Sequence, residues 1–235
     1  MADLSDLKIV GPNDFGPLSF RLRRKLCWFY SQTLVYRRTK WWGWLTLKAY
    51  RRLYPNFHVG DNPKIWGRFQ LTMHTPFDSQ VVLGHNLHMV SDVRRSGITL
   101  FTKCKFTTTG QGRIVVGDNV QLNGVAITSR KSVEIGDGSL VAPNCIISDS
   151  DFHVIWPPKN RGHSDSTSAD RPVRIGRNVW LGLNVVVLKG VTIGDNSVIG
   201  AGSVVTGEIP PNVIAAGAPA SVIRQLPDDA VGHLA

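Results

Sequence analysis

The stretch IGRNVWLGLNVVVLKGVTIGDNSVIGAGSVVTG (175–207) decides the fold, because an aliphatic residue returns in it at every sixth position. Glycine follows that residue in four of the six units, and a small or β-branched residue stands four places after it in five of them. Six consecutive occurrences in one phase indicate an internal repeat rather than chance. The aliphatic positions are Ile175, Leu181, Val187, Ile193, Ile199 and Val205.

The same phase continues toward the N-terminus, with interruptions. The upstream positions in phase are Val116, Leu122, Ile135, Val141 and Ile147, with weaker signals at Leu83 and Met89. Between Leu122 and Ile135 the spacing is 13, which indicates one inserted residue. Between Ile147 and Ile175 it is 28, which is not a multiple of six. The repeat therefore breaks over residues 148–174.

The repeat predicts an all-β protein built as a parallel β-helix. Each six-residue unit is then a short strand followed by a corner, with the aliphatic side chain inside and Gly, Asn or Asp at the turn. Three units close one triangular coil of about 18 residues. An α-helix does not fit, because its period of 3.6 scatters residues spaced by six around its surface. A β-sandwich fits poorly, because its strands alternate with a period of two.

Residues 175–226 closely resemble the closing region of hexapeptide-repeat acyltransferases, with the best match in the sugar O-acetyltransferase group that includes maltose and galactoside acetyltransferases. The resemblance is strong over about 110–226 and weak over 60–110. It implies a left-handed β-helix, an exception to the usual right-handed crossover. It also implies a homotrimer with active sites in clefts between subunits.

We expect three parts in the chain. Residues 1–58 form a basic aromatic N-terminal arm, mainly helical, that lies outside the resemblance. Residues 59–226 form the β-helix, with a loop at 148–174, and residues 227–235 form a C-terminal tail. Because the interior of the coils is aliphatic, we expect the chemistry on the outside, near this polar loop.

The resemblance implies transfer of an acetyl group from acetyl-CoA to a sugar hydroxyl. A hydroxyl needs a base that is unprotonated near pH 7, and histidine, with an ordinary pKa of about 6.5, meets that need. His153 matches the family's catalytic histidine, about ten residues after an APN-type turn. Asn123, 30 residues before it, matches an asparagine that contacts the acceptor hydroxyl.

Alternatives to these assignments stay open. His153 also fits a solvent-exposed loop histidine, and Asn123 fits a corner residue of the β-helix, since Asn tolerates such turns. His163, in the same loop, is the reserve base. Asp149 or Asp151 is a candidate to orient the imidazole, and both also fit solvated loop acids.

The binding site for acetyl-CoA carries over less completely. The resemblance assigns contacts with acetyl-CoA to Trp180, Leu183, Gly200, Ala201, Gly202, Thr206 and Arg224. Leu183 stands where relatives often have serine, so we expect a backbone N–H near it to meet the oxyanion. Gly207 and Ser221 stand where Lys or Arg is common, so contact with the 3′-phosphate of CoA lacks those cations. The glycines also fit plain corners, and Trp180 also fits the cap of a coil.

A metal site is the first competing interpretation. His85 and His88 form an H-x-x-H pair, and γ-class carbonic anhydrases use three histidines on this fold. No third histidine has the matching spacing, so we expect no metal. The other competing functions are N-acylation of an aminosugar on the same scaffold and a non-catalytic β-helix that serves as a scaffold.

The net charge of +10 is concentrated in one segment. Residues 15–60 contain ten basic residues and no acid, and the rest of the chain has 17 of each sign. Residues 18–54 combine these cations with four of the seven tryptophans. We expect short amphipathic helices that contact an anionic membrane, with Leu45, Ala49 and Leu53 together on one side. Packing on the β-helix or on another subunit is the alternative.

Nucleic acid is not expected as a partner, because the body of the chain carries no matching motif. Three widely separated cysteines, Cys27, Cys104 and Cys145, do not form a disulfide framework or a zinc motif. No apolar run approaches the roughly 18 residues of a membrane-crossing helix, and no cleaved secretion signal is expected. We therefore expect a cytoplasmic protein, peripheral at the inner face of the plasma membrane, with a sugar or lipid-linked glycan as acceptor.

Overall fold

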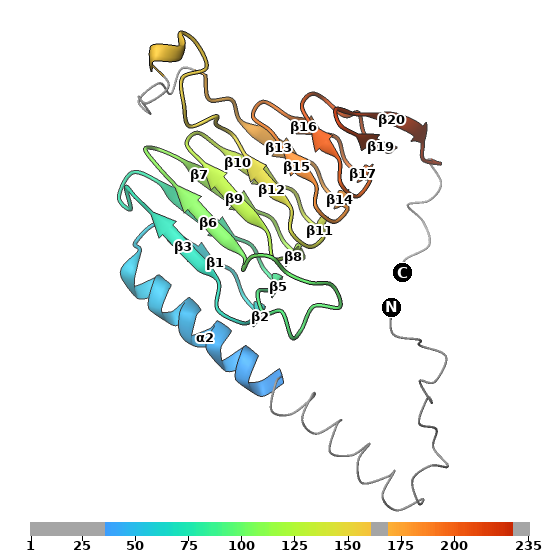
Figure 1. Ribbon diagram of the computed structural model, residues 1–235. Coiled ribbons are helices and arrows are strands. Elements are labelled where there is room, and N and C mark those ends of the chain that lie inside the picture. Colours follow the sequence, from blue (N-terminus) through green and yellow to red (C-terminus); the bar gives the residue numbers. More distant parts are fainter. Residues whose placement is uncertain (1–35, 161–168, 228–235) are drawn as a thin grey trace, which may run out of the picture. The chain divides into compact units, whose positions relative to one another are not determined.

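The computed structural model describes residues 36–160 and 169–227, and strands dominate them (Figure 1). Successive strands pass from one sheet to the next, so that each coil adds one strand to each of three sheets. Strand pairing is parallel throughout except between the last two strands. The predicted left-handed parallel β-helix is confirmed.

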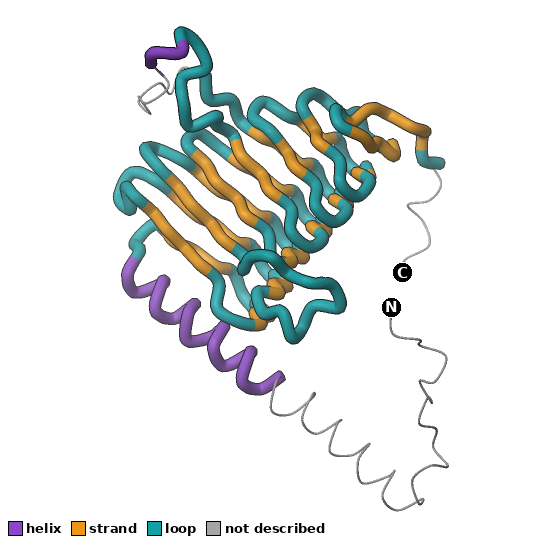
Figure 2. The backbone as a smooth tube through the Cα atoms, in the orientation of Figure 1, coloured by secondary structure: helices purple, strands orange, loops and turns teal. Residues whose placement is uncertain are grey.

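From β1 to β18 every third strand lies in the same sheet, as the stacked coils in Figure 2 show, and β19 and β20 both join sheet B. Sheet A contains β1 (Phe57–Val59), β4 (Gln80–Leu83), β7 (Arg113–Val116), β10 (Val133–Ile135), β13 (Val173–Ile175) and β16 (Thr192–Ile193). Sheet B contains β2 (Lys64–Trp66), β5 (His88–Val90), β8 (Gln121–Asn123), β11 (Leu140–Val141), β14 (Trp180–Leu181), β17 (Val198–Ile199), β19 (Val213–Gly217) and β20 (Ala220–Gln225). Sheet C contains β3 (Gln70–Met73), β6 (Lys105–Thr108), β9 (Ala126–Ser129), β12 (Ile146–Ser148), β15 (Val186–Val187) and β18 (Val204–Val205).

The chain runs from sheet A to B to C in every coil, and we call the three corners the AB, BC and CA edges. The aliphatic residues of the repeat fill the interior, as predicted. Each of them is at most 3% exposed, including the weak upstream signals Leu83 and Met89. Full burial of such a side chain stabilises the fold by about 1.5–3 kcal/mol. The stacked aliphatic positions therefore supply the main stabilisation of the β-helix.

The AB edge is built from asparagines in the left-handed backbone conformation. Neighbouring coils are linked there by side-chain amides: Asn178 Nδ2 donates to Asn196 Oδ1 at 3.2 Å, and Asn196 Nδ2 donates to Asn212 Oδ1 at 2.8 Å. Asn is one of the few residues besides glycine that adopts this conformation at low cost. Residues with φ of 54–62° at this edge are Asn62, Asn86, Asn119, Asn178, Asn196 and Asn212.

The helix α2 (Tyr36–Leu53) covers the first coil of the β-helix from Thr39 onward. Thr39 and Leu47 are buried, and the carbonyl oxygen of Thr39 accepts a hydrogen bond from Gly67 N at 2.9 Å. The Tyr50 ring packs on Phe69 with a centroid distance of 5.3 Å. The helix therefore shields the apolar end of the stack from water.

The buried side of α2 differs from the predicted side. Leu53 is 69% exposed and Ala49 is also exposed, whereas Thr39, Gly43 and Leu47 face the coils. A small residue is required at the closest approach, because a Cβ on Gly43 would lie 2.4 Å from the Ile65 carbonyl oxygen. Sequence periodicity favoured the side with Leu45, Ala49 and Leu53, but the close approach of the helix to the first coil requires the side that carries Gly43.

Residues 39–53 therefore pack on the β-helix, which was the alternative to helices that only contact a membrane. The chain also divides into two compact units, Met1–Arg38 and Thr39–Ala235, so this part of α2 belongs to the unit that contains the β-helix. The expected boundary at residue 58 stays a prediction. Residues 1–35 of the arm and 228–235 of the tail lie outside the described residues. Within the described part of the chain, α2 is too polar to cross a bilayer, and no other helix there is long enough.

Two excursions interrupt the coils, of which the sequence predicted one. The predicted excursion leaves sheet C after β12, contains the short 3-10 helix η4 (Pro158–Asn160), and rejoins at β13; its residues 161–168 are not described. The other excursion, residues 91–103, leaves the BC edge after β5. The Asn144 side chain holds it, because Nδ2 donates to Thr99 O at 3.0 Å and Oδ1 accepts from Phe101 N at 2.8 Å.

Candidate active site

Most residues assigned to acetyl-CoA lie along the BC edge. Leu183 and Gly202 occupy this edge in neighbouring coils, and Gly202 N donates to Leu183 O at 2.8 Å. Trp180 lies on the outer face of sheet B next to the edge and is 52% exposed. These positions, with Gly200 and Ala201, form a continuous strip on the outside of the coils.

The backbone of this strip is accessible at Ala201 and Gly202, where the residues are small. A Cβ built on Gly202 would meet no atom within 4 Å, and Gly202 has a φ of +72°. Ala201 and Gly202 are exposed. A ligand can therefore approach the peptide groups of this turn closely, which is the property that an amide-rich chain such as pantetheine needs.

Thr206 and Arg224 lie apart from this strip. Thr206 follows β18 and lies at the CA edge, at the other side of sheet C. Arg224 is exposed on β20, where it pairs with Ile214 of β19 at the C-terminal end of the stack. One protomer therefore does not bring all seven predicted contacts together.

Asn123 lies on the BC edge, in a coil nearer the N-terminus. It ends β8, is half-buried, and its Nδ2 lies 3.5 Å from Val141 O in a long hydrogen bond. The next residue, Gly124, has a φ of +48° and is crowded by Leu100 of the 91–103 excursion. Asn123 is therefore next to an excursion that sequence analysis missed, because its SDVRRSGITLFTK sequence carries no repeat or catalytic motif.

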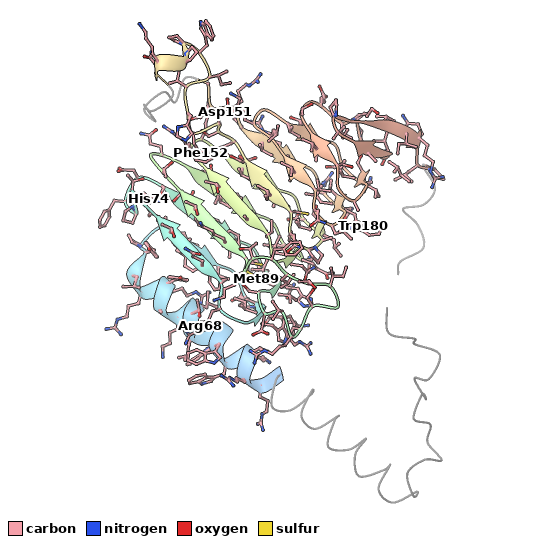
Figure 3. All side chains as sticks on the ribbon, in the orientation of Figure 1. Arg68, His74, Met89, Asp151, Phe152 and Trp180 are labelled. Carbon is pink, nitrogen blue, oxygen red and sulfur yellow. The ribbon has the colours of Figure 1, made fainter. Side chains whose placement is uncertain are left out.

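His153 lies beyond the opposite edge of sheet C. It is exposed and follows β12, at the start of the large excursion. Figure 3 shows Asp151 and Phe152 at this CA edge, well away from Trp180. Four strand residues of about 3.3 Å each, plus the corners, separate the BC and CA edges by roughly 15 Å. Asn123 and His153 of one chain therefore do not meet across sheet C.

The carboxylates proposed to orient the imidazole are engaged elsewhere. Asp149 is fully buried: its Oδ2 accepts hydrogen bonds from Ser129 Oγ at 2.7 Å and Lys131 N at 2.8 Å, and its Oδ1 accepts one from Arg130 N at 2.8 Å. Asp151 forms an ion pair with Lys189 in the next coil. These contacts fix the base of the excursion, so both acids position the segment that carries His153. His163 lies outside the described residues.

A cleft of about 440 Å³ lies at the CA edge, below the base of this excursion. Arg130 Nε lies 3.3 Å from Asp170 Oδ2, and both side chains are almost fully buried. Asp170 Oδ2 and Thr109 Oγ1 are buried and accept no hydrogen bond from the residues that the structure describes. The cleft is lined by Thr109, Gly110, Gln111, Arg130, Lys131 and Asp170.

Sequence analysis missed this cleft for a physical reason. Its lining residues come from two successive turns of the CA edge and from the returning end of the excursion, so no local motif contains them. The available signal was the 13-residue spacing between Leu122 and Ile135. Ile127 is a buried residue between these two, five positions after Leu122 and eight positions before Ile135. The longer interval passes through the CA edge, where the lengthened turn at Arg130–Lys131 forms one wall of the cleft.

The histidines weighed as metal ligands have other roles. His85 Nδ1 accepts a hydrogen bond from Asp61 N at 3.1 Å at the AB edge. The His88 ring packs on Trp66 on sheet B, and burial, with the charges of Lys64 and Arg95, lowers the pKa of His88 from 6.5. Among the residues that the structure describes, no three His, Cys, Asp or Glu side chains are grouped to hold a metal.

Comparisons with known proteins agree with this architecture. Residues 172–207 match the family model described as "Hexapeptide repeat of succinyl-transferase". Galactoside O-acetyltransferase of Escherichia coli is 47% identical over 116 residues, which cover 49% of this chain and 55% of the relative. The E. coli protein WbbJ, provisionally named a lipopolysaccharide biosynthesis O-acetyl transferase, is 41% identical over 128 residues, which cover 49% and 62%. The chain thus spans little more than half the length of these relatives.

A solved structure shows the same fold at low identity. A mutant of AntD, an N-acyltransferase from Bacillus cereus in complex with dTDP-4-amino-4,6-dideoxyglucose and coenzyme A, superposes with a TM-score of 0.58 at 16% identity. The superposition covers 79% of this chain and 91% of that one. The chain therefore folds as a β-helix of six-residue repeats, and about half of it is similar in sequence to sugar O-acetyltransferases.

Proposed function

We propose that the protein is an acetyl-CoA-dependent O-acetyltransferase that modifies a sugar hydroxyl. The observation that carries the proposal is the 47% identity to galactoside O-acetyltransferase over 116 residues. The open glycine turn of the BC edge and the polar cleft of the CA edge support it, because acetyl transfer needs one surface for each substrate.

In the proposed reaction His153 accepts the proton of the sugar hydroxyl as its oxygen attacks the thioester carbonyl. The new C–O bond forms, the C–S bond breaks, and the CoA sulfur leaves as a thiol with the proton that the imidazole took up. Asn123 holds the acceptor hydroxyl, and a backbone N–H near Leu183 stabilises negative charge on the carbonyl oxygen. No covalent enzyme intermediate is required, because the thioester is already activated.

The residues of the BC edge fit the acyl donor. The exposed turn at Ala201 and Gly202 lets pantetheine approach the backbone closely, and the exposed Trp180 ring offers an apolar contact beside it. Arg224 is exposed at the C-terminal end of the stack of coils and is suited to contact a phosphate of CoA. Gly207 and Ser221 are also exposed, so they add space but no charge.

We also propose that the active form is a homotrimer. Asn123 and the donor strip lie at one edge of sheet C, and His153 and the cleft lie at the other. Association of the BC edge of one copy with the CA edge of the next brings these groups together at a subunit interface. The site is incomplete in one protomer, which makes self-association part of the proposed mechanism.

The proposed acceptor is a sugar hydroxyl of a surface polysaccharide or glycolipid precursor. The cleft at the CA edge has room for a sugar ring, and the exposed side chains of Gln111 and Lys131 that line it are suited to hydrogen bonds with hydroxyls. The name of WbbJ supports the choice of pathway class. We place the enzyme in the cytoplasm, at the inner face of the plasma membrane.

The test is an assay of acetyl-CoA consumption with a panel of sugars, nucleotide sugars and lipid-linked glycans. His153→Ala is expected to lower kcat about 10²- to 10⁴-fold, as removal of a general base does. His58→Ala is the matched control, since His58 is an exposed histidine on sheet A, and it should keep full activity. Activity on aminosugars that survives His153→Ala would instead favour N-acylation. If calorimetry detected no binding of acetyl-CoA, the result would favour a non-catalytic β-helix that serves as a scaffold.

A further inference from the structure

The outer face of α2 is chemically unlike its inner face. Trp41 and Trp44 are each 54% exposed, and Lys48 and Arg52 continue the same side of the helix at spacings of three and four residues. The Lys48 ammonium lies 5.1 Å from the centre of the Trp44 ring. We call these four residues, Trp41, Trp44, Lys48 and Arg52, the outer stripe.

Neighbouring residues of the same types are engaged with the β-helix. The Arg68 guanidinium stacks on Trp42 at 3.7 Å from the ring centre, and Figure 3 shows Arg68 beside α2. The Arg51 guanidinium donates a hydrogen bond to Val59 O. Folding therefore divides the basic and aromatic residues of α2 into one set that packs inward and one that faces away from the coils.

Charge identifies the partner. No Asp or Glu occurs between residues 15 and 60, so neither α2 nor the 20 residues before it can neutralise the outer stripe. A second copy that placed its own α2 there would add like charges. Tryptophan with Lys or Arg on a helix that lies flat is suited to the headgroup region of an anionic bilayer, where each cation contributes about 1 kcal/mol.

We propose that the outer stripe docks the protein on anionic membranes. The helix lies in the membrane plane, with the Trp41 and Trp44 rings among the headgroups and Lys48 and Arg52 beside lipid phosphates. The opposite side of α2 stays on the first coil through Thr39, Gly43 and Leu47. Docking does not depend on the proposed acetyl transfer, and it brings the enzyme to lipid-carried acceptors.

The test uses the full chain, because removal of α2 would uncover the apolar first coil. Sedimentation with vesicles of phosphatidylcholine alone, or with 30% phosphatidylglycerol (about one lipid in three), measures binding at low and high salt. We expect binding only to the anionic vesicles, and weaker binding at high salt. Lys48→Glu with Arg52→Glu should weaken it about tenfold or more. Trp41→Ser with Trp44→Ser should weaken it at unchanged net charge.

Arg113→Glu with Arg174→Glu is the control, since it changes net charge equally through exposed residues of sheet A. It should keep vesicle binding. Equal loss in the control and the α2 variant, or equal binding to neutral vesicles, would overturn the proposal. A change in oligomeric state of the α2 variant, measured by light scattering, would assign the stripe to a second copy instead. Acetyl-CoA consumption with a soluble acceptor should stay unchanged, which separates docking from catalysis.

Discussion

At the scale of single residues, Asp149 shows how a buried carboxylate fixes an irregular segment. It is fully buried, and three donors from the neighbouring coil satisfy its two oxygens. Its own carbonyl accepts a hydrogen bond from Arg171 N at 3.0 Å, which joins the two stems of the large excursion. A charge buried in this way is stabilising only while its donors are in place.

Asp149→Asn is therefore expected to destabilise the protein and to lower activity. The amide has the size of the carboxylate, but it keeps only one acceptor oxygen, so its NH₂ group must face the backbone N–H of either Arg130 or Lys131. The cost should be about 1.5–3 kcal/mol, as for loss of a charge-assisted hydrogen bond in a buried site. Urea unfolding measures it. Asp151→Asn, which removes one partly exposed ion pair, should cost less than about 1 kcal/mol, and equal costs would contradict the anchoring role.

The two described cysteines allow a prediction about pH. Burial raises the pKa of Cys104 to about 12 and that of Cys145 to about 11, from 9.0. The folded state therefore keeps protons that the unfolded state loses above pH 9. Their stabilising contribution is complete below pH 9 and declines as pH rises toward 12. Cys104→Ala with Cys145→Ala should flatten the fall in unfolding free energy between pH 9 and 10.5.

Thiol labelling gives an independent check. In a Cys27→Ser background, neither remaining thiol should react with a disulfide reagent at pH 8 while the protein is folded, because the reactive thiolate is disfavoured. Both should react after unfolding in urea. Rapid labelling of either thiol in the folded protein would contradict the burial of these residues.

At the scale of elements, α2 has two functional sides. Its inner side closes the end of the β-helix, which would otherwise expose Phe57, Ile65 and Phe69 to water. Its outer side carries the outer stripe. Short amphipathic helices are marginal alone, so the stack of coils stabilises the helix that shields it.

Gly43→Ala tests the inner side. A Cβ at this position would lie 2.4 Å from the Ile65 carbonyl oxygen, so the helix must shift away from the first coil. Overpacking of this kind should cost about 1–3 kcal/mol, although alanine favours the helix itself. Thermal unfolding measures the change. Gly97→Ala, in open space on the 91–103 excursion, should be neutral, and a stabilised Gly43→Ala protein would show that α2 is not packed here.

At the scale of the whole molecule, sheet C separates the two groups of residues that the proposed active site needs. The BC edge carries Asn123 and the proposed donor strip, whereas the CA edge carries His153 and the cleft. The stiffness of stacked coils prevents the two edges of one chain from approaching each other. A second copy of the chain is the simplest way to complete the site.

Mixed oligomers test this arrangement. Asn123→Ala and His153→Ala proteins should each be nearly inactive, but co-expressed chains should recover about a quarter of wild-type activity, since each mixed trimer contains one site with both native residues. Size-exclusion chromatography with light scattering checks that the trimer forms. A mixture of separately purified trimers that do not exchange subunits is the control. No recovery in co-expressed trimers would place both residues of each site in one chain.

The sequence by itself determined the architecture of the β-helix. A period of six leaves one geometric solution, because inward aliphatic residues such as Leu181 and Ile199 must stack on each other in a triangular coil. The positions of the edges followed from the same phase, and the interruption after Ile147 predicted the large excursion. The resemblance to sugar O-acetyltransferases singled out His153 and Asn123 as candidates, and their roles stay proposals.

Only the tertiary structure decided which residues from different coils lie next to each other. The cleft joins Thr109, Arg130 and Asp170 from separate turns, and the inner side of α2 depends on the clearance between Gly43 and Ile65. The separation of Asn123 from His153 across sheet C also appears only when the coils are closed. The physical reason is that a repeat specifies each unit through local contacts, whereas clefts and caps arise from residues that are distant in sequence and meet only when the coils stack.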